Sequence, residues 1–292
     1  MNVPYPTLFA TITLAFLLVY RALLIGFYFL LLKRRWSTTL LVLLLPFTGF
    51  VTGIVREVAG VDFNRIRRGV VIIIIAITVF FFIGLETAVN IIILFLYLHP
   101  ELSLSDMVRE VTHGTFSLYI ALIFYGGIIL ACLTLSKNPA TLGWKRKKKV
   151  GRAVLYGILG AAAMLAILIV YLLLISLFFP NLKSPSNVPE MRGRWEVLYF
   201  LISAALLAPI GEETFFRGLL YETLKRRWGW VASALTTALL FSIAHISLIS
   251  ILPIFFGGII LAYLKEKNDW LLPPVITHST YNTIIVLIAV FL

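Results

Sequence analysis

The chain has 292 residues, of which 61% are hydrophobic and only 13% are charged, and its mean hydropathy is +1.01. Soluble domains typically carry about 25% charged residues, so this composition excludes a soluble globular protein and indicates a polytopic membrane protein. The 25 Lys and Arg residues against 13 Asp and Glu residues give a net charge of +12. We interpret this surplus as membrane topology and expect no nucleic-acid partner, because basic residues collect in cytoplasmic loops.

Basic clusters and Pro or Gly residues divide the chain into apolar segments that we expect to be helices, since backbone within lipid must satisfy its own hydrogen bonds. We expect about nine segments: 5–32, 37–55, 70–98, 112–135, 153–179, 197–224, 230–248, 250–264 and 270–292. The fold class is therefore all-α, a polytopic transmembrane bundle of about eight to nine helices. The single Cys132 lies inside an apolar segment and excludes an intrachain disulfide.

The segment ends and the loop charges predict further details. One helix over 228–264 would be about 55 Å long, nearly twice the ~30 Å hydrocarbon core, so we expect a turn near 247–253. Loops 136–152 and 221–229 are rich in Lys and Arg and are expected on the cytoplasmic side, whereas 99–114 is acidic and expected outside. Segment 37–55 has basic clusters at both ends, so either it is re-entrant or one cluster lies on the opposite side.

Ionisable residues inside membrane spans are costly, about 2.5–3.5 kcal/mol each on insertion scales, so they should face a protein interior or a wet cavity. We therefore expect an intramembrane polar cavity. Glu86 and Asn90 are four residues apart and could line that cavity, pair with Arg21 or act as packing contacts between helices. The residues of this kind are Arg21, Glu86, Glu212, Glu213, Arg217, His245 and His278, with Asn90 and Asn282 as polar companions.

The densest group of these residues follows an apolar run in the sixth segment. Glu213 and Arg217 are four residues apart with the acid first, the favourable order for an ion pair on one helix face. Glu212 is rotated from that face by about 100° and has no partner in its own helix. A carboxyl of this kind can accept and release a proton, so Glu212 is the best candidate for a general base in the chain.

Two further pairs of residues show the same four-residue spacing. Phe241 precedes His245 in the seventh segment, and His278 precedes Asn282 in the ninth, so each pair lines one helical face. A rise of 1.5 Å per residue places Glu212 and these His and Asn residues about 14–24 Å from the expected cytoplasmic ends of their helices. This similarity in depth allows the four polar residues to form one site near the middle of the membrane.

At these residues the sequence resembles the type II CAAX prenyl endopeptidase family, and the wider group of prokaryotic membrane proteins that includes bacteriocin-processing and self-immunity members. The family signature is Glu-Glu-x-x-x-Arg, then Phe-x-x-x-His, then His-x-x-x-Asn, each in its own transmembrane helix. The chain carries all three motifs in this order, at 212–217, 241–245 and 278–282. The resemblance extends over about a quarter of the chain and implies an intramembrane glutamate protease with a cavity open toward the cytoplasmic leaflet.

The resemblance also implies roles for the motif residues. Glu212 and His245 would activate the attacking water, and His278 and Asn282 would stabilise the oxyanion. The supporting residues would be Glu213, Arg217 and Phe241. The family implies chemistry without a metal or another cofactor; a zinc ion bound by Glu212, His245 and His278 is the alternative, because His₂Glu is a common zinc ligand set.

We therefore predict a membrane endopeptidase that cleaves near the C-terminus of prenylated CAAX or other membrane-associated proteins. Residues 1–292 would form one membrane-embedded domain, with accessory helices in 1–110 and the catalytic core in 195–290. The protein would be a multi-pass integral protein of the cell membrane, if prokaryotic. Two other classes remain open: a non-enzymatic immunity or scaffold protein that keeps the polar network for structure, and a proton-coupled transporter using Glu212 and Glu86.

Overall fold

The structure is a computed structural model, which describes residues 115–136, 139–145, 149–180 and 193–291, the run 83–92 and scattered positions between Ala15 and Phe81. These described residues form helices and turns without any strand, so the all-helical prediction is confirmed for them. Most of segments 5–32, 37–55 and 70–98 lies outside the described residues, and the count of eight to nine helices stays a prediction. The chain divides into two compact units, Met1–Lys137 and Asn138–Leu292, and the predicted domain limits are untested.

The first unit contains helix α6, Thr115–Leu135, and a shorter apolar helix, Ile83–Ile92. A carboxylate oxygen of Glu86 accepts hydrogen bonds from the backbone N–H of Thr48 at 2.9 Å and from its hydroxyl at 2.8 Å. Arg21, which the sequence offered as one alternative partner of Glu86, lies outside the described residues. Glu86 therefore ties two segments of the first unit together, as expected of a polar packing contact within a membrane protein.

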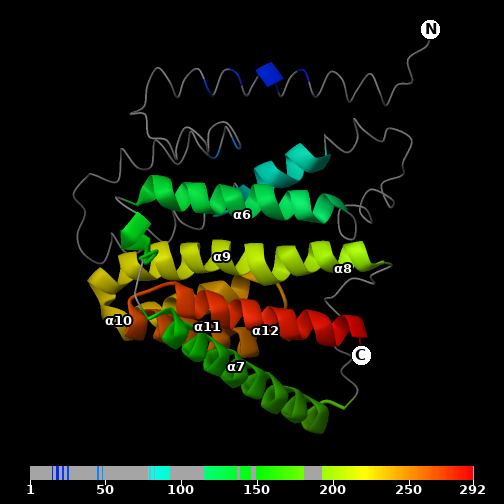
Figure 1. Cartoon of the computed structure of the whole chain (residues 1–292), viewed down its shortest axis with the longest axis vertical. Coiled ribbons are helices and arrows are strands. Elements are labelled where there is room, and N and C mark those ends of the chain that lie inside the picture. The colour runs from blue at the N-terminus through cyan, green and yellow to red at the C-terminus, as the bar shows by residue number, and fades with distance from the viewer. Residues whose placement is uncertain are drawn as a thin grey trace. The chain divides into compact units, whose positions relative to one another are not determined.

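The second unit begins with the 3₁₀-helix η1, Pro139–Leu142, and the long helix α7, Val150–Phe178. A continuous helical run follows, and then two more helices (Figure 1). The run consists of α8 (Arg194–Leu201), the π-helix η2 (Ile202–Leu207), α9 (Ala208–Glu213), the π-helix η3 (Thr214–Tyr221) and α10 (Glu222–Ala244). The last two helices are α11, Ile251–Asn268, and α12, Leu272–Phe291.

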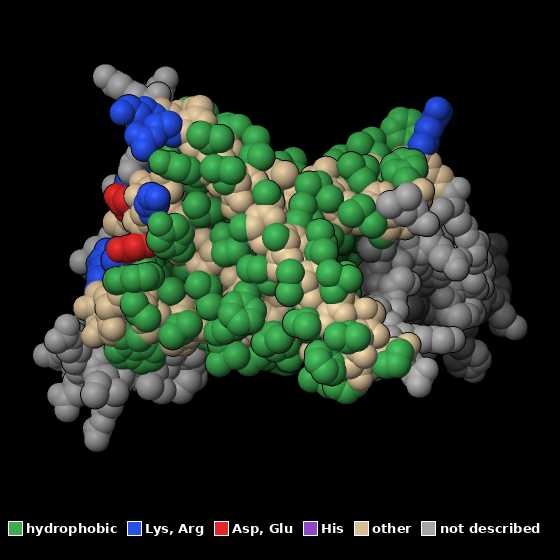
Figure 2. All heavy atoms as spheres, turned by 90° about the horizontal axis from the view of Figure 1, so that it is seen from below, with side chains coloured by type: hydrophobic (Ala, Val, Ile, Leu, Met, Phe, Trp, Pro, Cys, Tyr) green, Lys and Arg blue, Asp and Glu red, His purple; other side chains and the backbone are tan. Residues whose placement is uncertain are grey.

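Within the described residues, four helical stretches are long and apolar enough to cross a membrane: Leu118–Leu135, Val150–Phe178, Arg194–Ala244 and Leu272–Phe291. The third has 51 residues, too long for one crossing. Gly229 divides it, because its φ of 81° and ψ of 173° lie outside the helical range. This break lies between the predicted segments 197–224 and 230–248. On the face in Figure 2, hydrophobic side chains dominate and most charged side chains gather at one edge, which fits an integral membrane protein.

Close helix packing in the second unit depends on small residues. A Cβ atom added to Gly160 of α7 would lie 2.6 Å from the Thr277 hydroxyl of α12, and one added to Gly258 of α11 would lie 2.9 Å from Ala238 of α10. Both distances are shorter than a carbon atom can tolerate, so these helices reach their observed separation only with glycine. Gly160 and Gly258 are therefore packing residues between helices.

The ends of the last two helices are fixed by polar contacts and by proline. Helix α11 continues to Asn268, four residues beyond the predicted end at 264, where Lys225 of α10 forms an ion pair with Glu266. Burial alone would raise the pKa of Glu266, but hydrogen bonds from Lys225 and from Tyr221 at 2.7 Å outweigh it, and the pKa lies below its ordinary value. Helix α12 begins at Leu272 with two prolines in its first turn, where the missing N–H groups of proline leave no helix hydrogen bond unmade.

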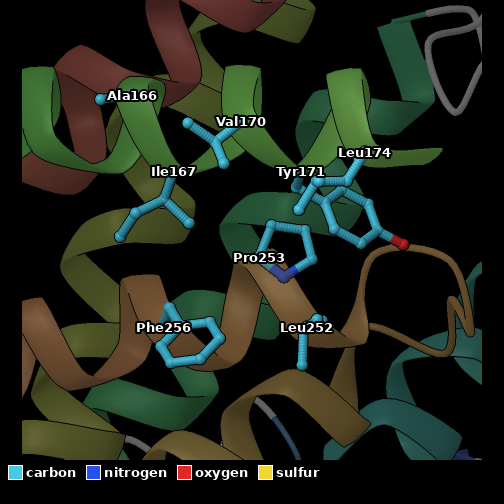
Figure 3. A pocket seen from close by; sticks show the side chains of 8 residues that line it. All are labelled: Ala166, Ile167, Val170, Tyr171, Leu174, Leu252, Pro253 and Phe256. Carbon is cyan, nitrogen blue, oxygen red and sulfur yellow. The ribbon is translucent and has the colours of Figure 1, made fainter. Parts of the chain in front are cut away.

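A groove of about 390 Å³ opens between α7 and α11 (Figure 3). Apart from the Tyr171 hydroxyl it is lined by apolar groups, and that hydroxyl donates a hydrogen bond to the Ile249 carbonyl in the turn before α11. The lining residues are Ala166, Ile167, Val170, Tyr171, Leu174, Leu252, Pro253 and Phe256. The groove therefore differs from the polar cavity that the sequence led us to expect, and that cavity is not confirmed.

Candidate active site

Two π-helices flank the Glu212–Glu213 pair, and Pro209 explains the first of them. A proline inside a helix lacks an N–H group and its ring crowds the carbonyl four residues earlier, which loosens the helix. In η2 the N–H of Ala208 donates to Ser203, five residues back, so the same register would pair Pro209 with the Ala204 carbonyl. Proline cannot make that bond. The Asn282 amide of α12 takes its place, with Nδ2 2.7 Å from the Ala204 oxygen.

Glu213 and Arg217 form the ion pair that their spacing predicted. Their Oε1 and Nη1 atoms are 2.9 Å apart, and both side chains are fully buried. Nη2 of Arg217 donates to the Gly258 carbonyl of α11 at 3.1 Å, and the guanidinium lies 4.3 Å above the Phe241 ring of α10. This one cation therefore holds three helical segments together within a buried environment.

His278 of α12 bridges the two glutamates. Its Nδ1 lies 3.0 Å from Glu213 Oε1 and its Nε2 lies 3.8 Å from Glu212 Oε2. The Glu213 carboxylate, paired with Arg217, can only accept hydrogen bonds, so Nδ1 carries the hydrogen and Nε2 faces Glu212. The Glu212 side chain remains 14% exposed, whereas Glu213 is fully buried. The two adjacent acids thus have different environments: one is locked in an ion pair and the other is accessible.

The structure places His245 at a helix end, not within a helix as predicted. Helix α10 ends at Ala244, and His245 is its C-cap. Nδ1 of His245 lies 2.8 Å from the Phe241 carbonyl. A carbonyl oxygen only accepts, so Nδ1 carries the hydrogen and Nε2 of the neutral ring keeps a lone pair that can take a proton.

Phe241 lies between the charged and the imidazole groups of the site. Its ring makes edge contacts with the rings of His245 and His278, at centroid distances of 4.7 and 5.7 Å. Arg217 stacks on the same ring. Phe241, predicted as a supporting residue, therefore joins α10, η3 and α12 around its ring. Its contacts and those of His278 with the two glutamates connect one cluster of five residues: Glu212, Glu213, Arg217, His245 and His278. Asn282 is one turn beyond His278 and is bound to Ala204 rather than to another of these residues.

The residue after His245 has a strained backbone. Ile246 has a φ of 51°, a left-handed conformation that is unfavourable for a β-branched side chain. Helices commonly end with glycine at this position. Because its side chain is 94% exposed, the conformation is imposed by the turn that follows α10 and not by burial of the side chain.

Replacing Ile246 with glycine is therefore expected to stabilise the protein by up to about 1 kcal/mol. Relief of about 1–2 kcal/mol of left-handed strain exceeds the roughly 0.5–1 kcal/mol that glycine loses in chain entropy. Thermal unfolding in detergent measures the change. Leu248→Gly is the matched control, because Leu248 is 90% exposed in the same turn and has no positive φ; it should lower the melting temperature slightly. Equal falls for both variants would contradict the strain argument.

Sequence reasoning missed several polar contacts of the site. The Trp144 indole N–H donates to the Thr214 hydroxyl at 3.0 Å, across 70 positions of sequence. No spacing rule could reveal that contact, whereas Pro209 was a visible signal for the irregular helix. Among the described residues, no three His, Cys, Asp or Glu side chains are arranged to hold a metal ion. Whether the reaction needs a metal stays a prediction.

Comparisons with known proteins point to the same part of the chain. Residues 194–284 match the family described as type II CAAX prenyl endopeptidase Rce1-like. An Escherichia coli protein described as an uncharacterized 24.3 kDa protein is 30% identical over 112 residues, which make up 37% of this chain and 49% of that protein. The chain thus spans about half the length of this curated relative. No solved structure matches.

The matched segment begins at the first residue of α8 and ends within α12, so it contains all the motif residues of the connected cluster. The family is one of proteases, which supports a hydrolase in the membrane. The resemblance that the three motifs indicated is therefore confirmed over residues 194–284, which match the Rce1-like type II CAAX prenyl endopeptidase family.

Proposed function

We propose that the protein is a glutamate-dependent endopeptidase that hydrolyses a peptide bond near the C-terminus of a prenylated or otherwise membrane-associated protein. One observation carries the proposal: His278 lies between Glu212 and Glu213, with Nδ1 3.0 Å from Glu213 and Nε2 3.8 Å from Glu212, while Arg217 forms its direct ion pair with Glu213. Glu212 is left as a carboxylate that is partly exposed and close to an imidazole. This arrangement suits a base that removes a proton from water.

In the proposed reaction, Glu212 and the lone pair of His245 Nε2 orient a water molecule and Glu212 takes its proton. The water oxygen attacks the scissile carbonyl carbon and gives a tetrahedral oxyanion. The second N–H of the Asn282 amide, the one not bound to Ala204, can donate to that oxyanion. His278 becomes a second donor when Glu212 passes to Nε2 the proton that it took from water. The C–N bond then breaks, and Nε2 gives the proton to the leaving amine.

Reconstitution in liposomes tests this function. A farnesylated peptide ending in a CAAX sequence is added to the purified full chain, and mass spectrometry follows release of the C-terminal tripeptide. The same peptide without the farnesyl group shows whether the lipid is recognised. Release from the farnesylated peptide alone would support a CAAX protease. Equal release from both would support an endopeptidase that does not need prenylation, and release from neither would contradict this substrate class.

The second candidate is a non-enzymatic immunity or scaffold protein. The observation in its favour is that Arg217 joins η3, α10 and α11 within the protein interior, a contact that would stabilise the bundle without any catalysis. It predicts that the wild-type protein releases no peptide, so that Glu212→Gln has no hydrolysis to remove.

A further inference from the structure

The loop that follows η1 is packed against the helix that carries the Glu-Glu-x-x-x-Arg motif. Leu142 is 1% exposed, and its carbonyl oxygen would lie 2.8 Å from a Cβ atom added to Gly218 of η3. Gly143 has a φ of +91° and accepts a hydrogen bond from the Leu271 N–H at 3.1 Å. Lys145 forms an ion pair with Asp269 at 2.5 Å. The loop is therefore fixed on both sides, against η3 and against the turn between α11 and α12.

From this loop, the Trp144 side chain reaches the point where the motif helix changes its hydrogen-bond register. Thr214 is the first residue of η3 and follows Glu213 directly. Its hydroxyl donates to the Ile210 carbonyl at 2.7 Å and accepts from the Trp144 indole at 3.0 Å. Thr214 is 1% exposed, so its hydroxyl has no bulk water as an alternative partner. The indole thus holds the junction between α9 and η3.

The position of that junction decides where the two acids point. Backbone hydrogen bonds join residues four apart in an α-helix and five apart in a π-helix. If the junction moved along the chain, the side chains before the junction would therefore rotate about the helix axis relative to the side chains after it. Glu212 and Glu213 precede the junction, and Arg217 follows it. The Glu213–Arg217 contact and the approach of Glu212 to His278 both depend on this relative rotation.

We propose that Trp144 is a positioning residue of the active site: its hydrogen bond to Thr214 fixes the α-to-π junction and thereby aims Glu212 at His278. This inference rests on the proposed function for its kinetic consequence, but not for its structural one. Trp144 touches none of the reacting groups. It acts through Thr214, and it connects the site to the loop expected on the cytoplasmic side.

The hydrogen bond is tested without any substrate by NMR of the full chain in detergent micelles, with ¹⁵N-labelled tryptophan. Trp144→Phe identifies the indole signal by its disappearance. In Thr214→Val, which lacks the acceptor, that signal should shift and its hydrogen should exchange faster; in Thr214→Ser it should stay close to its original position. An unchanged indole signal in Thr214→Val would overturn the proposed bond.

The positioning role is tested by labelled histidine signals and by kinetics. The His278 ring signal should move in Trp144→Phe and Thr214→Val, but not in Thr214→Ser or in the control Trp230→Phe, whose side chain is 47% exposed. With the farnesylated peptide, the first two variants should lower kcat about three- to tenfold, the range expected for loss of one neutral hydrogen bond, with KM unchanged. The double variant Trp144→Phe/Thr214→Val should be no slower than either single variant, because both substitutions remove the same hydrogen bond.

The two readouts separate the possible failures. A moved indole signal with an unchanged His278 signal and unchanged kcat would overturn the positioning role. A moved His278 signal in a wild-type protein that cleaves no peptide would support the positioning of Glu212 while contradicting the proposed function. Equal loss of kcat in Thr214→Ser and Thr214→Val would also count against the inference, because serine keeps the hydroxyl.

Discussion

Glu212→Gln is expected to reduce peptide hydrolysis by at least about 10²- to 10⁴-fold, the contribution of a positioned general base. Glutamine has the same shape as glutamate but cannot take a proton from water. The folded state should be retained, because the Glu212 side chain is partly exposed and does not belong to the Arg217 ion pair. Tripeptide release in liposomes and thermal unfolding of the same preparation measure the two properties.

Glu196→Gln is the matched control for this experiment, since Glu196 lies in α8 of the same helical run but outside the cluster. It should retain full turnover. His245→Ala should resemble Glu212→Gln, because the same water would lose its second acceptor. Full turnover by Glu212→Gln would contradict the assignment of the base, whatever the control shows.

Arg217→Ala is expected to lower the free energy of unfolding by about 3–5 kcal/mol, the usual penalty when one partner of a buried ion pair is removed. Glu213 would be left as a buried carboxylate without its cation, and Gly258 would lose a hydrogen-bond donor. Within the described residues, Glu213 Oε2 and Arg217 Nε have no hydrogen-bond partner, so each charge depends strongly on the other. Denaturant or thermal unfolding in detergent measures the effect.

The double variant Glu213→Gln/Arg217→Met separates charge from packing. It removes both charges and keeps similar side-chain volume, so it should recover most of the stability that Arg217→Ala loses. If the double variant and Arg217→Ala were equally unstable, the penalty would come from lost packing and not from an uncompensated charge. If neither variant were destabilised, the ion pair would not stabilise the fold and the assigned structural role would be wrong.

The part of the site that the sequence could predict is the part that depends on local spacing. Glu213 and Arg217 are four residues apart, and this alone predicted their contact, because residues at that separation share a helix face. Gly229 marks the break between two predicted segments, since glycine adopts a positive φ without strain. The resemblance based on three motifs named Phe241 and the five residues of the connected cluster.

The remaining features depend on contacts between distant segments. The bonds of Arg217 to Gly258 and of Trp144 to Thr214 join residues 41 and 70 positions apart, which no periodicity encodes. His245 was expected inside a helix because the apolar run continues beyond it, but the backbone turns at Ile246 against the preference of that side chain. The expected polar cavity was inferred from the cost of ionisable groups in lipid, yet in the second unit Glu213 pairs with Arg217 and His278 inside the protein.

The two π-helices have a consequence for how related sequences should be aligned. A π-helix needs one residue more than an α-helix to close each hydrogen-bonded ring. A relative with ordinary α-helix in place of Ile202–Leu207 or Thr214–Tyr221 would therefore be one residue shorter at that point. A single-residue gap beside the Glu-Glu pair should be accepted as a change of helix type, and an alignment that forbids it would shift the Glu-Glu-x-x-x-Arg motif out of register with the helix before it.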